Sequence, residues 1–392
     1  MKKNTAIPAI RFKGFTAPWE QRKLGEVSDS YSGGTPSVGV KAFYGGDIPF
    51  IRSAEINSET TELFITKKGL DNSSARLVEV GDVLYALYGA TSGEVGRAKL
   101  KGAINQAILA IKPHEGYISE YLAQWLRKSK RNIVETFLQG GQGNLSGEIV
   151  KNLTVEFPAS EEQQAIGNFF ASIDTLITLH QRKLKKLHNI KKSMLEKMFP
   201  QKGSCYPEIR FKGFTAPWEQ RKLGDIVQIT MGQSPDGSTY SDKPSNYVLV
   251  QGNADLQNGW VYPRIWTTQL TKKAEAGDLI MSVRAPAGSM GKTAYSAVIG
   301  RGVAAIKGNE FIYQLLVKMD TDGFWKKLSC GSTFESLNSD SIRKAEIKAP
   351  TTAEQSHLGA FFKRLDTLIT LHQRKLKKLH NIKKSILEKM FV

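Results

Sequence analysis

The stretch that decides the fold is IRFKGFTAPWEQRKLG, residues 10–25, because it recurs letter for letter at residues 209–224. A second segment, DTLITLHQRKLKKLHNIKKS at residues 174–193, recurs at residues 366–385, and each copy soon ends in LEKMF. A long internal repeat predicts two copies of one structural plan, joined by a turn-rich linker at residues 200–208. Between the identical ends the sequences of the two copies differ strongly. This indicates one structural frame that carries two different central regions.

The size and charge of the chain agree with two basic domains. Its 392 residues exceed what one hydrophobic core usually serves. Lys and Arg number 55 against 37 Asp and Glu, which gives a formal net charge of +18. Such a charge favours a polyanionic partner, since binding releases counterions condensed on phosphates. The alternative is a highly soluble protein whose basic face binds nothing.

The cysteine content and the hydropathy of the sequence indicate the cellular compartment in which the protein is expected. The two cysteines, Cys205 and Cys330, cannot form a disulfide framework or a four-ligand zinc site. The first residues are polar, with no apolar signal core, and no apolar run approaches the length of a membrane span. We therefore expect a cytoplasmic protein without a membrane partner.

Each repeat should close with a long helix. A proline followed by a hydroxyl residue and then by Gln, as in Ser160 with Gln163 and Thr352 with Gln355, predicts a capping box. Beyond this start a mostly apolar heptad seam is interrupted by one His and one Lys per helix, His180 and Lys191 in the first and His372 and Lys383 in the second. The predicted seam residues are Ile173, Ile177, His180, Leu184, Leu187 and Met194, matched by Leu365, Ile369, His372, Leu376, Leu379 and Ile386.

The two seams predict that the helices pair as an antiparallel coiled coil, with pseudo-twofold symmetry and a domain at each end. About 38 helical residues give a spacer of roughly 57 Å. We expect the two seam histidines to pack rather than to bind metal. The lysines and arginines outside the seam are explained either by a solvated helix face or by contact with phosphates or an acidic partner.

The centre of each repeat predicts an α+β domain. Short apolar runs separated by glycine, such as residues 47–51 and 82–87, indicate strands of a mixed, irregular sheet. Residues 118–138 form an amphipathic pattern typical of a helix, with a counterpart at about residues 311–328. The predicted division is 1–158 for the first domain, 159–199 for a spacer helix, 200–208 for a linker, 209–350 for the second domain and 351–392 for a second spacer helix.

Motifs for catalysis are missing from the sequence. The fragment Gly291-Lys292-Thr293 ends like a phosphate-binding loop, but the glycine required five positions earlier is Pro286. We find no methyltransferase motif and no metal-ligand spacing. The chain is therefore predicted to be non-catalytic.

The order of short motifs resembles that of a known family, the specificity subunits of type I restriction-modification enzymes. Both repeats carry a Glu-Gln helix start, at residues 162–163 and 354–355, after a series of Gly-rich landmarks. These landmarks are residues 33–37, 45–49, 81–84, 88–91 and 105–107 in the first copy, and 232–235, 282–288 and 300–302 in the second. The resemblance covers nearly the whole chain.

The resemblance implies two target recognition domains held apart by two long helices that form an antiparallel coiled coil. Such a subunit selects a split double-stranded DNA sequence, one half per repeat, and the helices fix the gap. Its implied partners are two modification (methyltransferase) subunits and restriction (translocase-endonuclease) subunits. S-adenosylmethionine, ATP and Mg would be bound by those partners, with no cofactor, metal or catalytic residue in this chain.

Base contacts are expected from loop residues that can pair with base edges. The predicted DNA-binding residues are Arg52, Ser53, Tyr88, Thr91 and Gln106 in the first domain, and Gln251, Asn253, Arg284 and Arg301 in the second. Each has a structural alternative: Arg301, between two glycines, would equally fix a loop, and Tyr88 would equally belong to the core.

Two other hypotheses remain open at this point. One is a structural coiled-coil adaptor that binds DNA weakly or without specificity. The other is a stand-alone nuclease or methyltransferase whose motifs are not recognisable.

Overall fold

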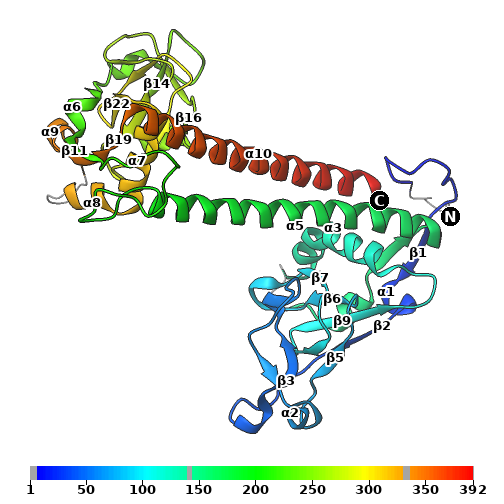
Figure 1. Ribbon diagram of the computed structural model, residues 1–392. Helices are drawn as coiled ribbons and strands as arrows, with labels where there is room; N and C mark the ends of the chain where they lie inside the picture. The colour runs from blue at the N-terminus through cyan, green and yellow to red at the C-terminus, as the bar shows by residue number, and fades with distance from the viewer. Residues whose placement is uncertain (1–6, 139–143, 330–335, 392) are drawn as a thin grey trace. The chain divides into compact units, whose positions relative to one another are not determined.

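The computed structural model describes residues 7–138, 144–329 and 336–391, which leaves Cys330 outside the described residues. The chain forms two compact units, each with one globular domain and parts of both long helices (Figure 1). Unit 1 comprises Met1–Leu179 and Leu376–Val392, and unit 2 comprises His180–Lys375. Among the described residues, no helix is long and apolar enough to cross a membrane.

The domain of unit 1 contains two irregular four-stranded sheets. In the first, β2 (Ser28–Ser32), β9 (Ile108–Pro113), β6 (Val83–Ala86) and β7 (Val95–Arg97) follow one another in antiparallel order. The second has the order β4 (Phe64–Ile65), β3 (Tyr44–Ile51), β8 (Gly102–Ile104) and β5 (Arg76–Val78), with β3 parallel to β8. The mixed, irregular sheet predicted from the sequence is thereby confirmed.

Helix α3 (Ser119–Leu138) covers the first sheet of unit 1 and lies between that sheet and the first half of α5 (Ser160–Lys197) (Figure 1). Its apolar face supplies Tyr121 and Leu126, which are fully buried together with Tyr85 of β6. A face of this kind stabilises the domain mainly by removing apolar surface from water.

The domain of unit 2 repeats this plan with more strands in each sheet. A six-stranded sheet has the order β12 (Gln228–Met231), β22 (Val303–Lys307), β19 (Leu279–Ser282), β20 (Met290–Lys292), β16 (Trp260–Val261) and β15 (Leu256–Gln257). A five-stranded sheet has the order β13 (Tyr240–Ser241), β17 (Ile265–Thr267), β14 (Tyr247–Val250), β21 (Ala297–Ile299) and β18 (Lys273–Ala274). As in unit 1, a central pair of the five-stranded sheet, β14 and β21, is parallel, and β16 and β20 of the six-stranded sheet are also parallel.

The single helix predicted at about residues 311–328 was wrong. The structure has two helices there, α7 (Glu310–Thr321) and α8 (Phe324–Leu328). Gly323 separates them with a φ of +72°, a left-handed conformation that glycine adopts without a steric penalty and that ends a helix.

The repeated segment at residues 10–25 and 209–224 builds the same frame twice. In unit 1, β1 (Glu20–Lys23) pairs with β10 (Thr154–Phe157), and in unit 2, β11 (Glu219–Lys222) pairs with β23 (Glu346–Ala349) in the matching register. Next to each antiparallel strand pair lie two short helices. These are α1 (Leu24–Val27) with α4 (Gly147–Lys151) in unit 1, and α6 (Leu223–Ile226) with α9 (Ser339–Arg343) in unit 2.

An arginine in each copy of this segment ties it to the long helix that follows. Arg11 donates to both oxygens of the buried Glu162 at 2.6 and 2.7 Å. Arg210 does the same to the buried Glu354 at 2.8 and 2.7 Å. The first residue of each Glu-Gln pair is therefore the acceptor of a bidentate arginine.

The predicted capping boxes were wrong in their details. Helix α5 begins at Ser160 and α10 (Thr352–Met390) at Thr352, so both hydroxyl residues lie inside the helix rather than at the cap. Gln163 instead donates to the carbonyl of Pro158 at 2.8 Å, and Gln355 to that of Pro350 at 3.0 Å. The glutamine side chains therefore bond the backbone just before each helix. The N-cap position falls one residue before Ser160 or Thr352.

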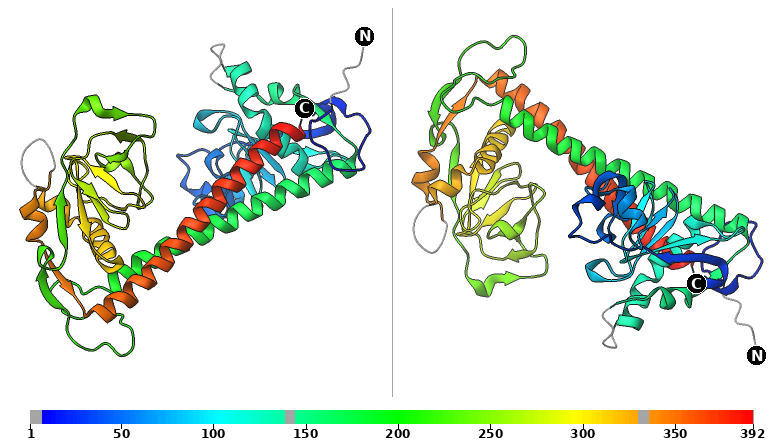
Figure 2. Two further views of the ribbon diagram at one scale, coloured as in Figure 1. Left: turned by 90° about the horizontal axis from the view of Figure 1, so that it is seen from above. Right: turned by 90° about the horizontal axis from the view of Figure 1, so that it is seen from below.

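Parts of the two long helices pair within each unit, and in unit 2 the contacts run in opposite chain directions. His180 meets His372, with 2.8 Å between the Nδ1 atoms, while Lys191, later in α5, bonds Asp366, earlier in α10, at 2.6 Å. In unit 1, Lys383 bonds Asp174 at 2.6 Å. Both views of Figure 2 show the last turns of α10, in red, beside the first half of α5. The helices are antiparallel.

The predicted seam residues lie along these contacts. Ile173 and Ile177 are buried in unit 1, where Leu376, Leu379 and Ile386 pack against the same core. Leu365 and Ile369 are buried in unit 2, Leu187 and Met194 pack against its core, and Leu184 is half-buried. The two lysines that interrupt the pattern each meet an aspartate of the other helix.

The LEKMF segment that ends both copies packs into a domain core in each unit. In unit 1 the ring of Phe391 packs on Tyr121 of α3, and in unit 2 the ring of Phe199 packs on Phe311 of α7. Each domain core is thus completed by the end of the helix that follows the other domain in sequence. Ile10 and Ile209 also bond the carbonyls of Lys389 and Lys197.

Candidate nucleic-acid interface

Four loops of unit 1 meet where its strands end. These loops, residues 33–37, 52–55, 87–91 and 105–107, are joined by backbone hydrogen bonds. Leu87 N donates to Ala107 O at 2.8 Å, Asn105 N to Ile51 O at 3.3 Å and Gly34 N to Ile104 O at 3.1 Å. We call this surface the loop platform of unit 1.

The loop platform of unit 2 consists of residues 232–236, 251–255, 283–288 and 300–302, and is joined in the same way. Val283 N donates to Gly302 O at 2.9 Å, Gly300 N to Val250 O at 2.8 Å and Gln233 N to Ile299 O at 2.8 Å. The same three connections therefore hold both platforms, although the side chains differ.

Two glycines allow the loops to approach so closely. A Cβ on Gly33 would lie 1.9 Å from the carbonyl oxygen of Ile104, and one on Gly232 would lie 2.1 Å from that of Gly300. A side chain cannot occupy that space, so both positions require glycine. The Gly-rich landmarks of the sequence are thus explained by backbone packing.

Two of the predicted residues of unit 1, Tyr88 and Gln106, come together on the platform. The ladder of β6 and β9 pairs Ala86 with Ile108, and its continuation through Leu87 and Ala107 places Tyr88 opposite Gln106. Gln106 is exposed, and its Oε1 accepts a hydrogen bond from the hydroxyl of Thr35. Partial burial raises the pKa of Tyr88, and a side-chain hydrogen bond with Gln106 opposes this rise.

The other predicted residues of unit 1 lie around this pair. Arg52 is bound by Glu55, with Nε–Oε2 and Nη2–Oε1 distances of 3.1 and 2.9 Å, so its guanidinium already has a partner. The ion pair lowers the pKa of Glu55. Ser53 begins the 3₁₀ turn η2 (Ser53–Glu55), and Thr91 ends η3 (Gly89–Thr91); both are half-buried.

In unit 2 the corresponding pair is Arg284 and Arg301. The ladder of β19 and β22 pairs Ser282 with Val303 and continues through the hydrogen bond from Val283 N to Gly302 O, and Arg284 and Arg301 are the next residue on each side. Arg284 also forms an isolated backbone bridge with Ser336. Both arginines are exposed, and within the described part of the chain neither side chain has a hydrogen bond or an ion pair. The backbone N of Arg301 donates to Ser234 Oγ at 3.1 Å, which holds the loop in place.

The remaining predicted residues, Gln251 and Asn253, lie on the neighbouring loop of unit 2. Gln251 N donates to Asp255 Oδ2 at 2.7 Å, and Asn253 begins η5 (Asn253–Asp255). Arg264 donates to the other oxygen of the buried Asp255 at 3.0 Å. The acid therefore anchors the loop from inside, as Glu55 does in unit 1.

Sequence reasoning missed several residues that shape the platforms, above all Thr35, Ser234 and Asp255. The signal was present for the first two, because each hydroxyl residue precedes a proline within a glycine landmark. Their partners are 71 and 67 positions away, a separation at which no local pattern predicts contact.

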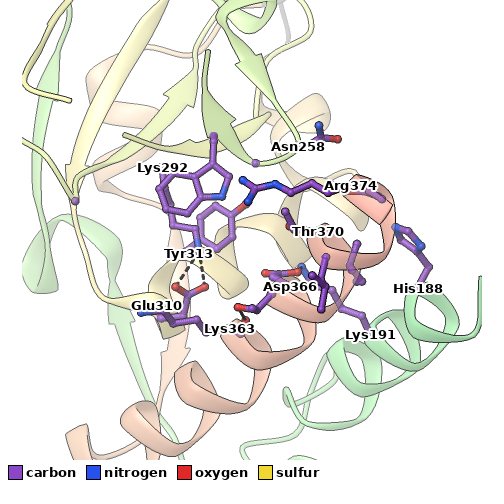
Figure 3. Close-up of a pocket in the computed structure, with 17 residues that line it drawn as sticks. His188, Lys191, Asn258, Lys292, Glu310, Tyr313, Lys363, Asp366, Thr370 and Arg374 are labelled. Atoms are coloured by element: carbon purple, nitrogen blue, oxygen red, sulfur yellow. Dashed lines mark hydrogen bonds and ion pairs between the residues drawn. The ribbon is translucent and has the colours of Figure 1, made fainter. Parts of the chain in front are cut away.

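A separate hollow of about 740 Å³ lies in unit 2 between β16, α7 and the two long helices (Figure 3). Lys292 lies in its wall, bonded to both oxygens of Glu310 at 2.9 Å and 4.2 Å from the centre of the Tyr313 ring. Lys292 is therefore a structural cation on strand β20, not the lysine of a phosphate-binding loop. The residues that line this hollow include none of those predicted to bind DNA.

Within the described ranges, no group of three or more His, Cys, Asp or Glu side chains is arranged to hold a metal ion. The two seam histidines bond each other, and desolvation, followed by the charges of His180, Lys183 and Lys375, lowers the pKa of His372.

Comparison with known proteins identifies the family. The family described as "Type I restriction modification DNA specificity domain" matches residues 17–189 and again residues 216–381. The chain belongs to this family. It is a type I restriction-modification specificity subunit, a DNA-recognition protein that is non-catalytic by itself and acts within a complex.

Individual relatives agree in length and fold. The chain is similar to the putative type I restriction enzyme MjaX specificity subunit of Methanocaldococcus jannaschii, with 25% identity over 94% of this chain and 92% of that one. It is 24% identical to the EcoR124I/EcoR124II specificity subunit of Escherichia coli over 43% of each chain. The crystal structure of the S subunit from M. genitalium has the same fold, with a TM-score of 0.73, 15% identity and 99% of both chains covered.

Proposed function

We propose that each loop platform of this specificity subunit contacts one half of a split, asymmetric DNA target and that the long helices fix the gap between the halves. One observation carries the proposal: the backbone frame of the platform is the same in both domains, while the exposed side chains at equivalent positions differ. Two equal frames with unequal side chains suit two different half-sites.

The side chains proposed to contact DNA are those at the platform edges. Arg, Gln and Asn pair with base edges in the major groove, while Ser, Thr and backbone N–H groups hold phosphates. Arg52 would first have to release Glu55, so we place it among the residues that position the loop or contact phosphate. The net charge of +18 supports the affinity of the whole surface for DNA.

The partners follow from membership of the family. We propose two modification subunits bound along the helices and restriction subunits beyond them, with S-adenosylmethionine, ATP and Mg bound by those subunits. The basic residues repeated on the outer helix faces, such as Lys185 and Lys377, would contact phosphates or an acidic partner. The division into two recognition domains, two spacer helices and a linker, and the cytoplasmic location, belong to the same proposal.

A chimaera tests whether the two domains act separately. The region between Gly224 and Ala349 is replaced by the region between Gly25 and Phe157, with the splice points inside the matching frames of β11–β23 and β1–β10. Expressed with a modification subunit, the chimaera should methylate a motif in which both halves carry the bases of the wild-type first half. A motif that keeps the wild-type second half would contradict the proposal.

A further inference from the structure

Tyr88 with Gln106 and Arg284 with Arg301 occupy the same place on the two platforms. Each pair lies one step beyond a ladder residue pair, Leu87 with Ala107 or Val283 with Gly302, whose backbone bonds match within 0.1 Å at 2.8 and 2.9 Å. Beside each pair lies a hydroxyl residue, Thr35 or Ser234, that bonds the second member. The backbone hydrogen bond before each pair is therefore the same in both units while the chemistry of the pair changes.

The pair in unit 2 is electrostatically incomplete. By contrast, the arginines on or beside the neighbouring loops have carboxylate partners: Arg52 pairs with Glu55, and Arg264 pairs with Asp255. Arg284 and Arg301 each lie one residue beyond the hydrogen bond from Val283 N to Gly302 O, and neither has an acidic partner among the described residues. Two exposed guanidinium groups without a carboxylate partner leave their N–H donors free for a ligand with hydrogen-bond acceptors.

We propose that Arg284 and Arg301 are the specificity-determining pair of the second domain and that they select guanine in the second half-site. The guanine edge in the major groove presents two acceptors, N7 and O6, which match the donors of a guanidinium, whereas adenine presents an amino donor in place of O6. The uncharged pair Tyr88 and Gln106 has both donors and acceptors, a combination that suits adenine. This inference rests on the proposed function.

A phosphate is the other ligand that two arginines would suit. Phosphates, however, have the same chemistry in both half-sites, so a phosphate-binding position should keep its cations in both repeats. Here the positive charge is present in one repeat and missing in the other, beside the same backbone hydrogen bond. Variation of this kind is expected of a position that distinguishes bases.

The test uses the full chain with a modification subunit and two double variants. Arg284→Lys with Arg301→Lys keeps the charge but removes the planar fork that pairs with guanine. Arg284→Tyr with Arg301→Gln installs the pair of unit 1. Methylated motifs are determined by sequencing, and binding is measured on duplexes in which each base pair of the second half-site is changed in turn.

The lysine variant should lose about 10- to 100-fold of its discrimination at one guanine, while preference across the first half-site stays unchanged. The Tyr and Gln variant should shift that same position away from guanine. Tyr88→Ala with Gln106→Ala is the matched control and should relax the first half-site alone.

Three results would overturn the inference: a uniform loss of affinity with an unchanged motif, which indicates a phosphate contact; no change at all; or a loss of preference in both halves. A wild-type second half-site without guanine would also overturn it and would leave the proposed function intact. The proposed function itself fails on a different result, an unsplit wild-type motif.

Discussion

At the scale of single residues, the bidentate pairs of Arg11 with Glu162 and Arg210 with Glu354 give the arginine of the repeated segment the same role in both copies. Each glutamate carboxylate is 1% exposed, and each arginine also donates to a nearby carbonyl, of Ala17 or Ala216, at 2.6 Å. A buried acid of this kind must keep its partner, because an unpaired charge in the interior is costly.

Arg11→Ala should therefore destabilise unit 1 by about 3 kcal/mol, since it leaves Glu162 buried and unpaired. The free energy of unfolding is measured by urea denaturation. Arg22→Ala is the control: it breaks an exposed pair with Glu20 and should cost far less stability than Arg11→Ala. Equal losses in the two variants would mean that burial of Glu162 does not govern the effect.

Gly33→Ala should destabilise the same domain by about 1–3 kcal/mol, because the added methyl group meets the carbonyl oxygen of Ile104 and the loops must separate. Gly39→Ala is the matched control, because a methyl group there would meet nothing within 4 Å. Thermal unfolding of both variants measures the difference. A Gly33→Ala protein as stable as the control would contradict the close packing of the platform.

The fold was largely predictable at the scale of elements, and its failures have physical causes. Heptad periodicity located both long helices, and their lysines pair with Asp174 and Asp366 at the places where the apolar pattern breaks. The break at Gly323 was missed because the apolar pattern continues across it into α8. The capping boxes were misplaced because Gln163 and Gln355 bond proline carbonyls outside the helix.

Within unit 2 the seam contains a contact that depends on pH. Desolvation, the nearby His180 and then Lys183 and Lys375 lower the pKa of His372 below its ordinary value of 6.5. The folded state thus binds a proton at His372 less readily than the unfolded state, so this contribution to stability is complete above pH 6.5 and declines as the pH falls below it. Protonation of both rings would also place two charges at the 2.8 Å contact.

His372→Gln should consequently make the stability of the protein less sensitive to pH as the pH falls below 6.5. Urea denaturation at a series of pH values measures the slope. His380→Gln, on an exposed turn of the same helix, should leave the slope as in the wild type. If the His372 variant retained the full wild-type slope, the seam pair would not be the cause.

At the scale of the whole molecule, the repeat and the order of motifs predicted the family, and comparison with known proteins confirmed it. The candidate site was predicted only in part. Tyr88, Gln106, Arg284 and Arg301 were chosen as separate residues, and that they form two equivalent pairs was not foreseen. The pairing depends on strand neighbours far apart in sequence, such as β6 with β9 and the parallel β3 with β8, which no local pattern indicates.

The central claim is that one chain with two unequal platforms on one repeated frame selects a split DNA sequence. The most direct measurement is the methylated motif of a strain that expresses this chain together with a modification subunit, determined by genome-wide methylation sequencing. The account predicts two short sequences that differ from each other, separated by a gap of fixed length. A continuous motif, or two halves with the same sequence, would contradict it.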